Sequence, residues 1–167
     1  MLYLKEANVE DIEKEYEFVT NTPKNENGFT NSAAGCSKAE FVDKILPGYI
    51  NAAKGIGLPE GWVPETELFL WDDDEIVGLF RIRHCLTESL ATGAGHIGYG
   101  IRKEFRGRGY ASAGLRLTIE KAWNMISEDE IYMSVHKDNP ASLRVQIKNG
   151  AYIHHEDERE FYTRIKR

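Results

Sequence analysis

Seven of the 15 glycines fall within 22 consecutive residues, and this crowding constrains the fold more than any other feature of the sequence. They lie between Gly93 and Gly114 and overlap a basic segment, Arg102 to Arg116, which holds five arginines and lysines against one glutamate. Glycine allows sharp backbone bends and close approach of a ligand to the main chain. The sequence therefore predicts a strand, a glycine loop and a helix whose first backbone amides face an anion such as a phosphate.

The stretch from Gly98 to Ala111 differs from two common nucleotide-binding loops. The dinucleotide fingerprint needs Gly-x-Gly-x-x-Gly directly after a first strand, and the Walker loop needs Gly-x-x-x-x-Gly-Lys followed by Ser or Thr. This stretch matches neither pattern, so NAD and ATP are not the expected ligands. A tight turn that carries surface arginines is the structural alternative.

Length and composition indicate one globular domain, residues 1–167. The chain has 41% hydrophobic and 29% charged residues, which is close to the average for folded domains. Its longest uncharged run, from Ser89 to Ile101, is short and glycine-rich, so no membrane span is expected. The acidic N-terminal segment does not resemble a secretory signal, which favours a cytoplasmic protein. Cys36 and Cys85 are expected to be free thiols, and no metal site is predicted.

Charge is distributed unevenly along the chain. The formal net charge is −6, but residues 1–75 carry 16 acidic and 6 basic residues, whereas residues 76–167 carry 11 acidic and 15 basic ones. The acidic total argues against a nucleic-acid partner, and the basic loop is expected to attract a smaller anion.

Periodicity and turn residues predict an α+β order of elements. Asn8 is expected to cap a first helix with Val9, Ile12, Tyr16 and Val19 on its apolar face, a long loop follows to Gly35, and Pro47-Gly48 is expected to kink the second helix. The predicted strands are 2–7, 66–71, 76–84, 96–102, 131–136, 151–155 and 161–165, and the other predicted helices are 38–50, 111–126 and 139–149.

At this point the residues resemble a known family. The segment Arg106-Gly-Arg-Gly-Tyr-Ala111 is similar to the Q/R-x-x-G-x-G/A loop of the GNAT superfamily of acetyl-CoA-dependent N-acetyltransferases, and Asn139-Pro-Ala-Ser142 resembles the start of its last helix. The stretch Ile82-Arg-His84, followed by the stretch from Gly95 to Arg102, further resembles a bacterial subgroup of predicted acetyltransferases. The resemblance implies a single acetyl-CoA-binding domain with a mixed, mostly antiparallel sheet of six to seven strands flanked by about four helices.

The same resemblance assigns residues to the cofactor, acetyl-CoA. The backbone from Gly107 to Ser112 would cradle the diphosphate, with Arg106 and Arg108 adding electrostatic attraction, and Asn139 would contact the pantetheine arm from the opposite side. The complete set of expected cofactor-binding residues is Tyr99, Gly100, Ile101, Arg106, Gly107, Arg108, Gly109, Tyr110, Ala111, Ser112, Asn139 and Ser142. Tyr99 to Ile101 would pair with the arm through main-chain hydrogen bonds.

Catalytic residues are less well marked. His96 is the expected base, because it begins the fourth predicted strand, near where members of the resembled family often carry a glutamate, and a histidine can be neutral near physiological pH. Glu67 and His84 are the alternatives, and a water relay would need no single base. The family's frequent acid, a tyrosine four residues before the helix-ending glycine, is replaced by Gln146, which could only hydrogen-bond the sulfur. Tyr99, Tyr152 or solvent would then supply the proton.

The acceptor is expected to be a primary amine on a small molecule or a peptide, and the acidic N-terminal half favours a cationic one. Trp62 and Trp71 are candidates for the pocket wall. Two other functions stay open: a non-catalytic acyl-CoA-binding or sensing module, which the glutamine at position 146 favours, and an RNA-binding domain, which the negative total disfavours. A homodimer is possible.

Overall fold

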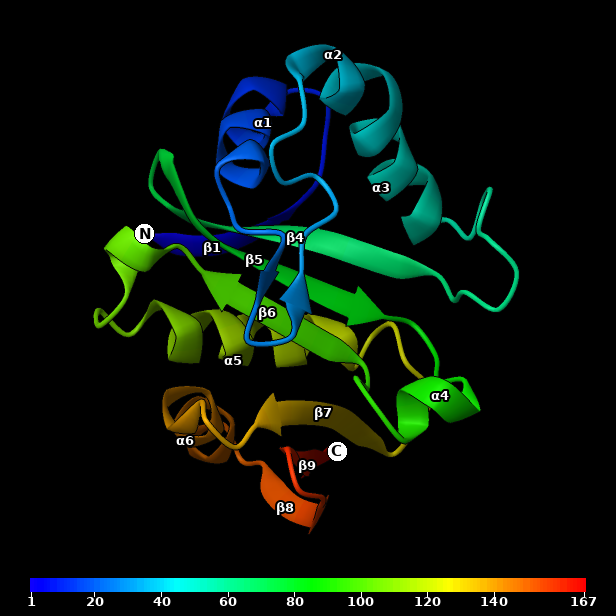
Figure 1. Cartoon of the computed structure of the whole chain (residues 1–167), viewed down its shortest axis with the longest axis vertical. Helices are drawn as coiled ribbons and strands as arrows, with labels where there is room; N and C mark the ends of the chain where they lie inside the picture. Colours follow the sequence, from blue (N-terminus) through cyan, green and yellow to red (C-terminus); the bar gives the residue numbers. More distant parts are fainter.

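The computed structural model describes all residues, 1–167, and its centre is a four-stranded antiparallel sheet (Figure 1). The sheet has the order β1-β4-β5-β6 and is formed by β1 (Leu2–Glu6), β4 (Glu65–Asp72), β5 (Glu75–Arg83) and β6 (Ile97–Ile101). A tight turn at Asp73, with φ of 51°, joins β4 to β5 and confirms the predicted hairpin. None of the helices combines the length and the hydrophobicity that a membrane-spanning helix needs.

A second sheet has the order β7-β9-β8 and contains the last three strands, β7 (Glu130–His136), β8 (Tyr152–Glu156) and β9 (Glu160–Lys166). All hydrogen-bonded strand neighbours in both sheets are antiparallel. β6 and β7 point the same way in Figure 1 but are joined only at an isolated bridge between Gly95 and Met133. Seven strands of the predicted α+β class are therefore present, divided between two sheets that diverge beyond this bridge.

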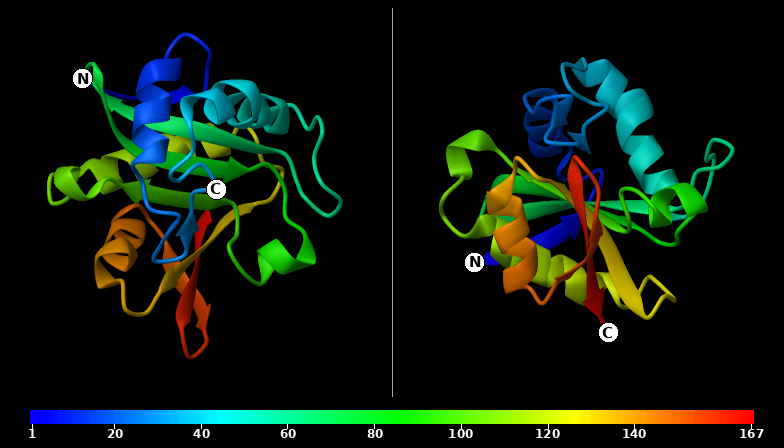
Figure 2. Two further views of the ribbon diagram at one scale, coloured as in Figure 1. Left: turned by 45° about the horizontal axis from the view of Figure 1, so that its top comes forward. Right: turned by 60° about the horizontal axis from the view of Figure 1, so that its bottom comes forward.

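Helices cover both faces of the central sheet (Figures 1 and 2). On one face lie α1 (Ile12–Thr20), α2 (Lys38–Glu40) and α3 (Leu46–Ala53), and on the other lies α5 (Tyr110–Ala122). α6 (Pro140–Lys148) follows β7 and packs beside α5, while α4 (Glu88–Ala91) is a single turn between β5 and β6. A 3-10 turn, Lys103–Phe105, leads from β6 toward α5.

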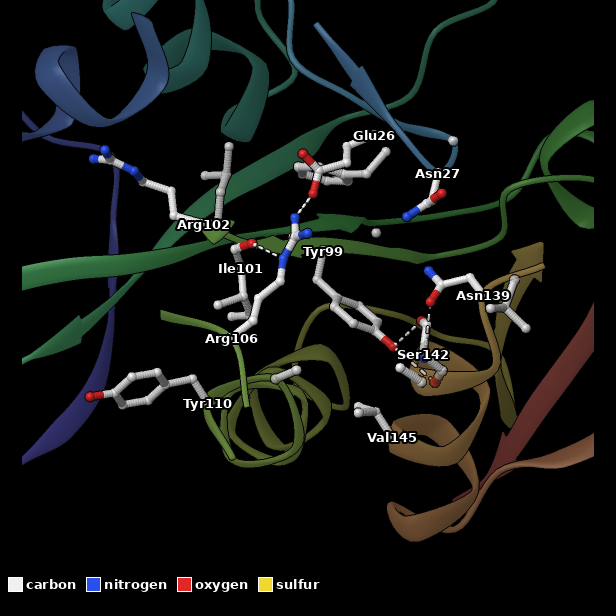
Figure 3. A pocket seen from close by; sticks show the side chains of 18 of the residues that line it. Glu26, Asn27, Tyr99, Ile101, Arg102, Arg106, Tyr110, Asn139, Ser142 and Val145 are labelled. Carbon is white, nitrogen blue, oxygen red and sulfur yellow. Dashed lines mark hydrogen bonds and ion pairs between the residues drawn. The ribbon is translucent and has the colours of Figure 1, made fainter. Parts of the chain in front are cut away.

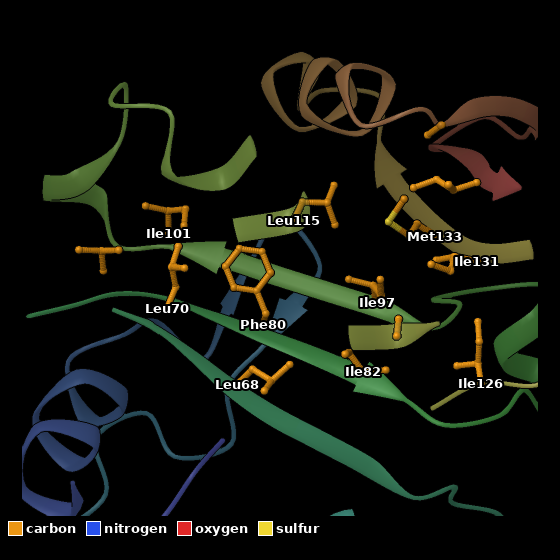
Figure 4. Close-up of a cluster of buried hydrophobic side chains, with 14 residues drawn as sticks. Leu68, Leu70, Phe80, Ile82, Ile97, Ile101, Leu115, Ile126, Ile131 and Met133 are labelled. Carbon is orange, nitrogen blue, oxygen red and sulfur yellow. The ribbon is translucent and has the colours of Figure 1, made fainter. Parts of the chain in front are cut away.

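The alternation of side chains along β4 and β5 creates one core on each face of the sheet. Leu68 and Phe80 face α5 in a cluster of 14 buried residues, which is drawn in Figure 4, whereas Phe69 and Leu79 face α1 and α3. At Gly114 a Cβ atom would lie 2.4 Å from the ring of Phe80, so glycine is required for α5 to pack directly against the sheet.

The helices on the first face differ from the prediction in their bounds. Asn8 does not cap α1: its side chain accepts from the Asp11 N–H and closes a turn, so the helix begins at Ile12 and Val9 is 67% exposed. The second predicted helix is interrupted by a π-helical turn, Phe41–Ile45, which directly precedes α3. The interruption predicted at Pro47 therefore lies just before it, because proline is accommodated in the first turn of the new helix.

The predicted loop from residue 21 to residue 35 contains a small hairpin. β2 (Asn25–Glu26) and β3 (Phe29–Thr30) are joined by Asn27 and Gly28, both with positive φ. An Asn-Gly pair favours a two-residue hairpin turn. The sequence analysis predicted a loop here and missed the two short strands, and the hairpin lies in front of β6 in Figure 1.

Candidate active site

A cleft of about 930 Å³ lies where β6 and β7 diverge, and it is the size of a typical ligand site. Its walls come from β6, the glycine loop, the first turns of α5 and α6, the end of β7, the β2–β3 hairpin and β5. Figure 3 shows Tyr99 and Arg106 reaching into it from below the hairpin. The cleft brings together the segments that the sequence assigned to the cofactor.

One edge of β6 is open to this cleft. In an antiparallel strand, the main-chain N–H and C=O groups of successive residues point to opposite edges of the strand. The Arg102 N–H donates to the Val77 carbonyl, and the Arg83 N–H donates to the His96 carbonyl. The even-numbered residues of this segment therefore form their main-chain hydrogen bonds with β5. Tyr99 and the other odd-numbered residues therefore direct their main-chain groups toward β7, where the cleft lies. This edge can pair with an extended ligand through the backbone.

The glycine loop supplies a row of free backbone donors. None of the N–H groups from Gly107 to Ser112 donates a hydrogen bond to a protein acceptor, and the first such bond of α5 is from Ala113 to Gly109. Gly107 and Gly109 have φ of 78° and 83°, conformations that other residues adopt only with strain. Six free amides at the start of a 13-residue helix form a site for an anion, and the helix dipole adds to its positive potential.

Hydrogen bonds connect this cradle to α6 on the opposite wall. Asn149 donates from Nδ2 to the Ser112 carbonyl at 3.2 Å, which joins the end of α6 to the start of α5. Asn139 caps α6 by accepting from the Ser142 N–H, as predicted. The Tyr99 hydroxyl lies 2.7 Å from Ser142 Oγ, so β6 and α6 are joined across the cleft (Figure 3).

The basic residues near the cradle have specific partners. Arg106 donates from Nε to the Ile101 carbonyl at 3.0 Å and forms an ion pair with Glu26 of the hairpin (Figure 3). Arg108 lies over the ring of Phe105 and does not line the cleft. Of the twelve residues predicted to bind the cofactor, eleven line the cleft and only Arg108 does not.

The hairpin covers the β6 side of the cleft. The Phe29 ring lies against Gly98 and Gly100, where an added Cβ would come within 3.2 Å and 3.1 Å of it. At the hairpin tip, Gly28 packs against the imidazole of His136 at the end of β7. Glycines on β6 thus make room for Phe29, and the hairpin extends from one sheet to the other.

Two arginines of β5 form another part of the wall. Arg81 donates from Nε to Glu67 Oε1 at 2.6 Å, and its Nη2 donates to the Thr30 carbonyl at 3.1 Å. Arg83 donates from Nη1 to the Gly95 carbonyl at 3.2 Å. Both arginines line the cleft, whereas Glu67 and Glu65, which stand beside them, do not.

The three expected bases lie outside the cleft. His96 is fully buried: it accepts from the Tyr132 N–H at Nδ1, its Nε2 is 3.3 Å from Glu128, and burial lowers its pKa. His84 pairs with Thr66, and Glu67 with Arg81. A general base must come within hydrogen-bonding reach of the substrate, and the structure places His96 outside the cleft, where it joins the starts of β6 and β7.

Gln146 does line the cleft, but its amide has protein partners. Its Oε1 accepts from the Thr163 hydroxyl at 2.6 Å, and its Nε2 donates weakly to the Ser134 carbonyl at 3.4 Å. It therefore connects α6 to β9 and β7. Tyr152 lies on the outer strand β8 and donates to Glu130, away from the cleft.

The charge of the cleft differs from the charge of the N-terminal half. Of the 16 acidic residues before position 76, only Glu26 lines it. The whole lining has three carboxylates against five arginines and lysines. Trp62 and Trp71 are also absent from the wall; Trp62 is 63% exposed and Trp71 lies in the core. The count of charges in residues 1–75 could not predict the charge of the cleft, because most acidic side chains of that half face outward.

Several residues of the wall were missed by the sequence analysis. Glu26, Asn27 and Phe29 belong to the hairpin, for which the Asn-Gly pair was the available signal. His136 and Glu160 also line the cleft, with His136 Nε2 3.5 Å from Glu160 Oε1. Nothing local in the sequence indicates that these two come together, because they lie on neighbouring strands 24 positions apart.

Comparisons with known proteins agree with this geometry. The family model described as "Acetyltransferase (GNAT) domain" matches residues 2–152. No curated protein matches the sequence.

Several solved structures share the fold. One described as a probable acetyltransferase has a TM-score of 0.72 at 17% identity, covering 99% of this chain and 93% of that one. Campylobacter jejuni N-acetyltransferase PseH, in complex with acetyl coenzyme A, has a TM-score of 0.62 at 14% identity and covers 100% and 99%. The Vibrio fischeri ribosomal-protein-S5-alanine acetyltransferase has a TM-score of 0.67 at 18% identity and covers 99% and 92%. With a family model that spans most of its length and a cleft whose walls come from the expected segments, this chain belongs to the GNAT family of acetyltransferases.

Proposed function

We propose that the protein transfers the acetyl group of acetyl-CoA to a primary amine of a small molecule or peptide, by direct attack of the amine on the thioester. The observation that carries this proposal is the row of six free amides from Gly107 to Ser112, next to the open edge of β6. The first site suits a diphosphate and the second suits an extended amide-containing arm. The acetyl-CoA bound in the similar PseH structure supports the same cofactor here.

The open edge of β6 also provides for the oxyanion. A main-chain N–H of this edge, near Ile101 or nearer the bridge to β7, would donate to the thioester carbonyl as it gains negative charge. Loss of one such donor typically costs about 3 kcal/mol of transition-state stabilisation.

Tyr99 is the proton donor that we propose for the departing thiolate. It lines the cleft, its hydroxyl lies beside Ser142, and burial raises its pKa, which keeps the phenol protonated. Gln146 stands where the resemblance expects a tyrosine on α6, and Tyr99 brings a hydroxyl toward that helix from the opposite wall. For the amine proton we propose His136, because it is the imidazole that lines the cleft.

Thiol release from acetyl-CoA with a panel of primary amines tests the activity. We expect acetyl-CoA to bind in calorimetry and turnover to appear with at least one amine. Tyr99→Phe should lower kcat by about 10-fold or more with little change in acetyl-CoA affinity, and His136→Gln should lower kcat/KM for the amine with little change in acetyl-CoA affinity.

Each result contradicts a different part of the proposal. Tight cofactor binding without turnover on any amine would favour a non-catalytic acyl-CoA module. Absence of binding would remove the cofactor assignment itself. Unchanged kcat in Tyr99→Phe would leave solvent as the proton donor.

A further inference from the structure

Arg83 has donors that no protein group uses. A guanidinium has five N–H donors, yet the structure gives Arg83 one hydrogen bond, from Nη1 to the Gly95 carbonyl. Its side chain is only 16% exposed and lines the cleft. None of its nitrogens is buried without a partner, so the remaining donors are accessible to solvent in a residue that lines the cleft.

The carboxylates near Arg83 compensate its charge only in part. Glu65 is the nearest, and its oxygen lies 3.8 Å from Arg83 Nε, too far for a hydrogen bond. The same carboxylate is 3.9 Å from Arg81 Nε, so two arginines share it. Glu67 is committed to Arg81. Burial and the neighbouring Arg81 lower the pKa of Arg83, which agrees with a positive charge that lacks a close partner.

The two arginines lie at the acyl end of the proposed cofactor site. Arg81 pairs with Gly98, and the Arg83 N–H donates to the His96 carbonyl, so both stand at the start of β6, next to the bridge between Gly95 and Met133. The amide cradle lies beyond the other end of this strand, which spans about 16 Å. A carrier arm laid along β6 from the cradle would place its acyl group near Arg83.

We propose that the acceptor amine carries a carboxylate and that Arg83 binds this carboxylate. The inference rests on the proposed function, since it names the substrate class of the same cleft. It replaces the cationic acceptor that the acidic N-terminal half suggested, because the acidic residues of that half, Glu26 excepted, do not reach the cleft. A guanidinium matches the planar, two-oxygen geometry of a carboxylate.

Matched acceptor pairs test this without changing the protein. The panel contains α-, β- and γ-amino acids, the amide of each one, and spermidine as a cationic amine without a carboxylate. We expect kcat/KM to be about 10- to 100-fold higher for the preferred acid than for its amide, because a lost hydrogen bond to a charged group is worth about 1.5–3 kcal/mol. Equal or better acetylation of the amides or of spermidine would overturn the inference.

Arg83 variants test the residue. In Arg83→Gln the preference for the acid over its amide should fall to about twofold. Arg83→Lys keeps the positive charge but not the planar pair of N–H donors, so it should retain part of the preference. Arg116→Gln is the control, because Arg116 is exposed on α5 and pairs only with Glu120. A preference that survives in Arg83→Gln would overturn the assignment of this residue.

Calorimetry separates this inference from the proposed function. Acetyl-CoA affinity is measured for the wild type and every variant. The affinities of N-acetylated acids and of their amides are also compared in the presence of CoA. This comparison measures the proposed contact between Arg83 and the carboxylate without turnover. If acetyl-CoA does not bind, the proposed function and the inference both fail. If it binds and the acids and amides bind alike, only the inference fails.

Discussion

The two sides of the cleft differ in whether main-chain groups or side chains line them. On the side where we propose the cofactor, the free polar groups are main-chain amides of the Gly107–Ser112 cradle and of the β6 edge. On the side where we propose the acceptor they are side chains of the hairpin and of β5, held by contacts such as the ion pair Arg81–Glu67 and the hydrogen bond from Arg81 to the Thr30 carbonyl. A backbone site keeps its chemistry when side chains change, whereas a site of side chains can be altered one residue at a time. The contrast explains how one fold can keep a cofactor while its acceptor varies.

The largest expected effect follows from disturbing the backbone of the cradle. In Gly107→Ala/Gly109→Ala, both residues lose the free access to positive φ that their angles of 78° and 83° require, and a Cβ at either position would meet no other atom. The cost of about 1–2 kcal/mol per residue is relieved by moving the loop, which takes the amides away from the phosphates. We expect the Kd for acetyl-CoA to rise about 100-fold, as measured by calorimetry.

Gly57→Ala is the matched control. Gly57 has φ of 69°, has no neighbour within 4 Å of a Cβ, and lies outside the cleft. It should lose about as much stability as one of the two cradle substitutions and leave the affinity unchanged. If the double variant binds acetyl-CoA normally, the cradle does not bind the diphosphate.

The same contrast explains which parts could be predicted from the sequence. The cradle depends on local signals, a run of glycines before a helix and Asn139-Pro140 at the start of another, and the structure places these segments together. The strands of the β4–β5 hairpin were also predictable, because apolar residues and a turn of three aspartates mark them. Such features are encoded within a few residues of where they act.

The acceptor side depends on contacts between distant residues, which a single sequence does not mark. Arg81 reaches Thr30, 51 positions away, and Arg106 reaches Glu26. His96 was chosen as the base for its position in the sequence, but the bridge that joins β6 to β7 buries it. Packing decides whether such a residue faces the cleft or the core.

The second effect concerns pH and lies outside the cleft, in α1. Glu15 of α1 is buried, one of its oxygens has no hydrogen-bond partner, and burial raises its pKa to about 8. The folded protein therefore holds a proton that the unfolded chain releases above its ordinary pKa of 4.5. The resulting stability is complete below pH 4.5 and is lost as the pH rises toward 8, by roughly 2 kcal/mol between pH 6 and pH 8.

Thermal or urea unfolding at these two pH values measures this loss. In Glu15→Gln, which keeps the acceptor for the Asn8 N–H, this part of the pH dependence should disappear. Glu13→Gln on the same helix removes an exposed charge and should leave the pH dependence as in the wild type. An unchanged slope in Glu15→Gln would mean that this carboxyl is ionised in the folded protein.

The smallest effect lies where the two sides meet, at the ion pair between Arg106 and Glu26 (Figure 3). Arg106 is 46% exposed and borders the cradle, so Glu26 competes with a bound diphosphate for its guanidinium. Glu26→Gln should lower the Kd for acetyl-CoA by about threefold at low salt, since partly exposed ion pairs are worth at most about 1 kcal/mol, and the gain should shrink at high salt. Glu120→Gln, which changes the net charge equally but pairs with Arg116 on the outer face of α5, should leave the Kd unchanged. If Glu26→Gln weakens acetyl-CoA binding instead, then Glu26 holds Arg106 in its binding position. The hairpin would in that case support the cofactor side, and the separation between the two sides would be less complete than their composition indicates.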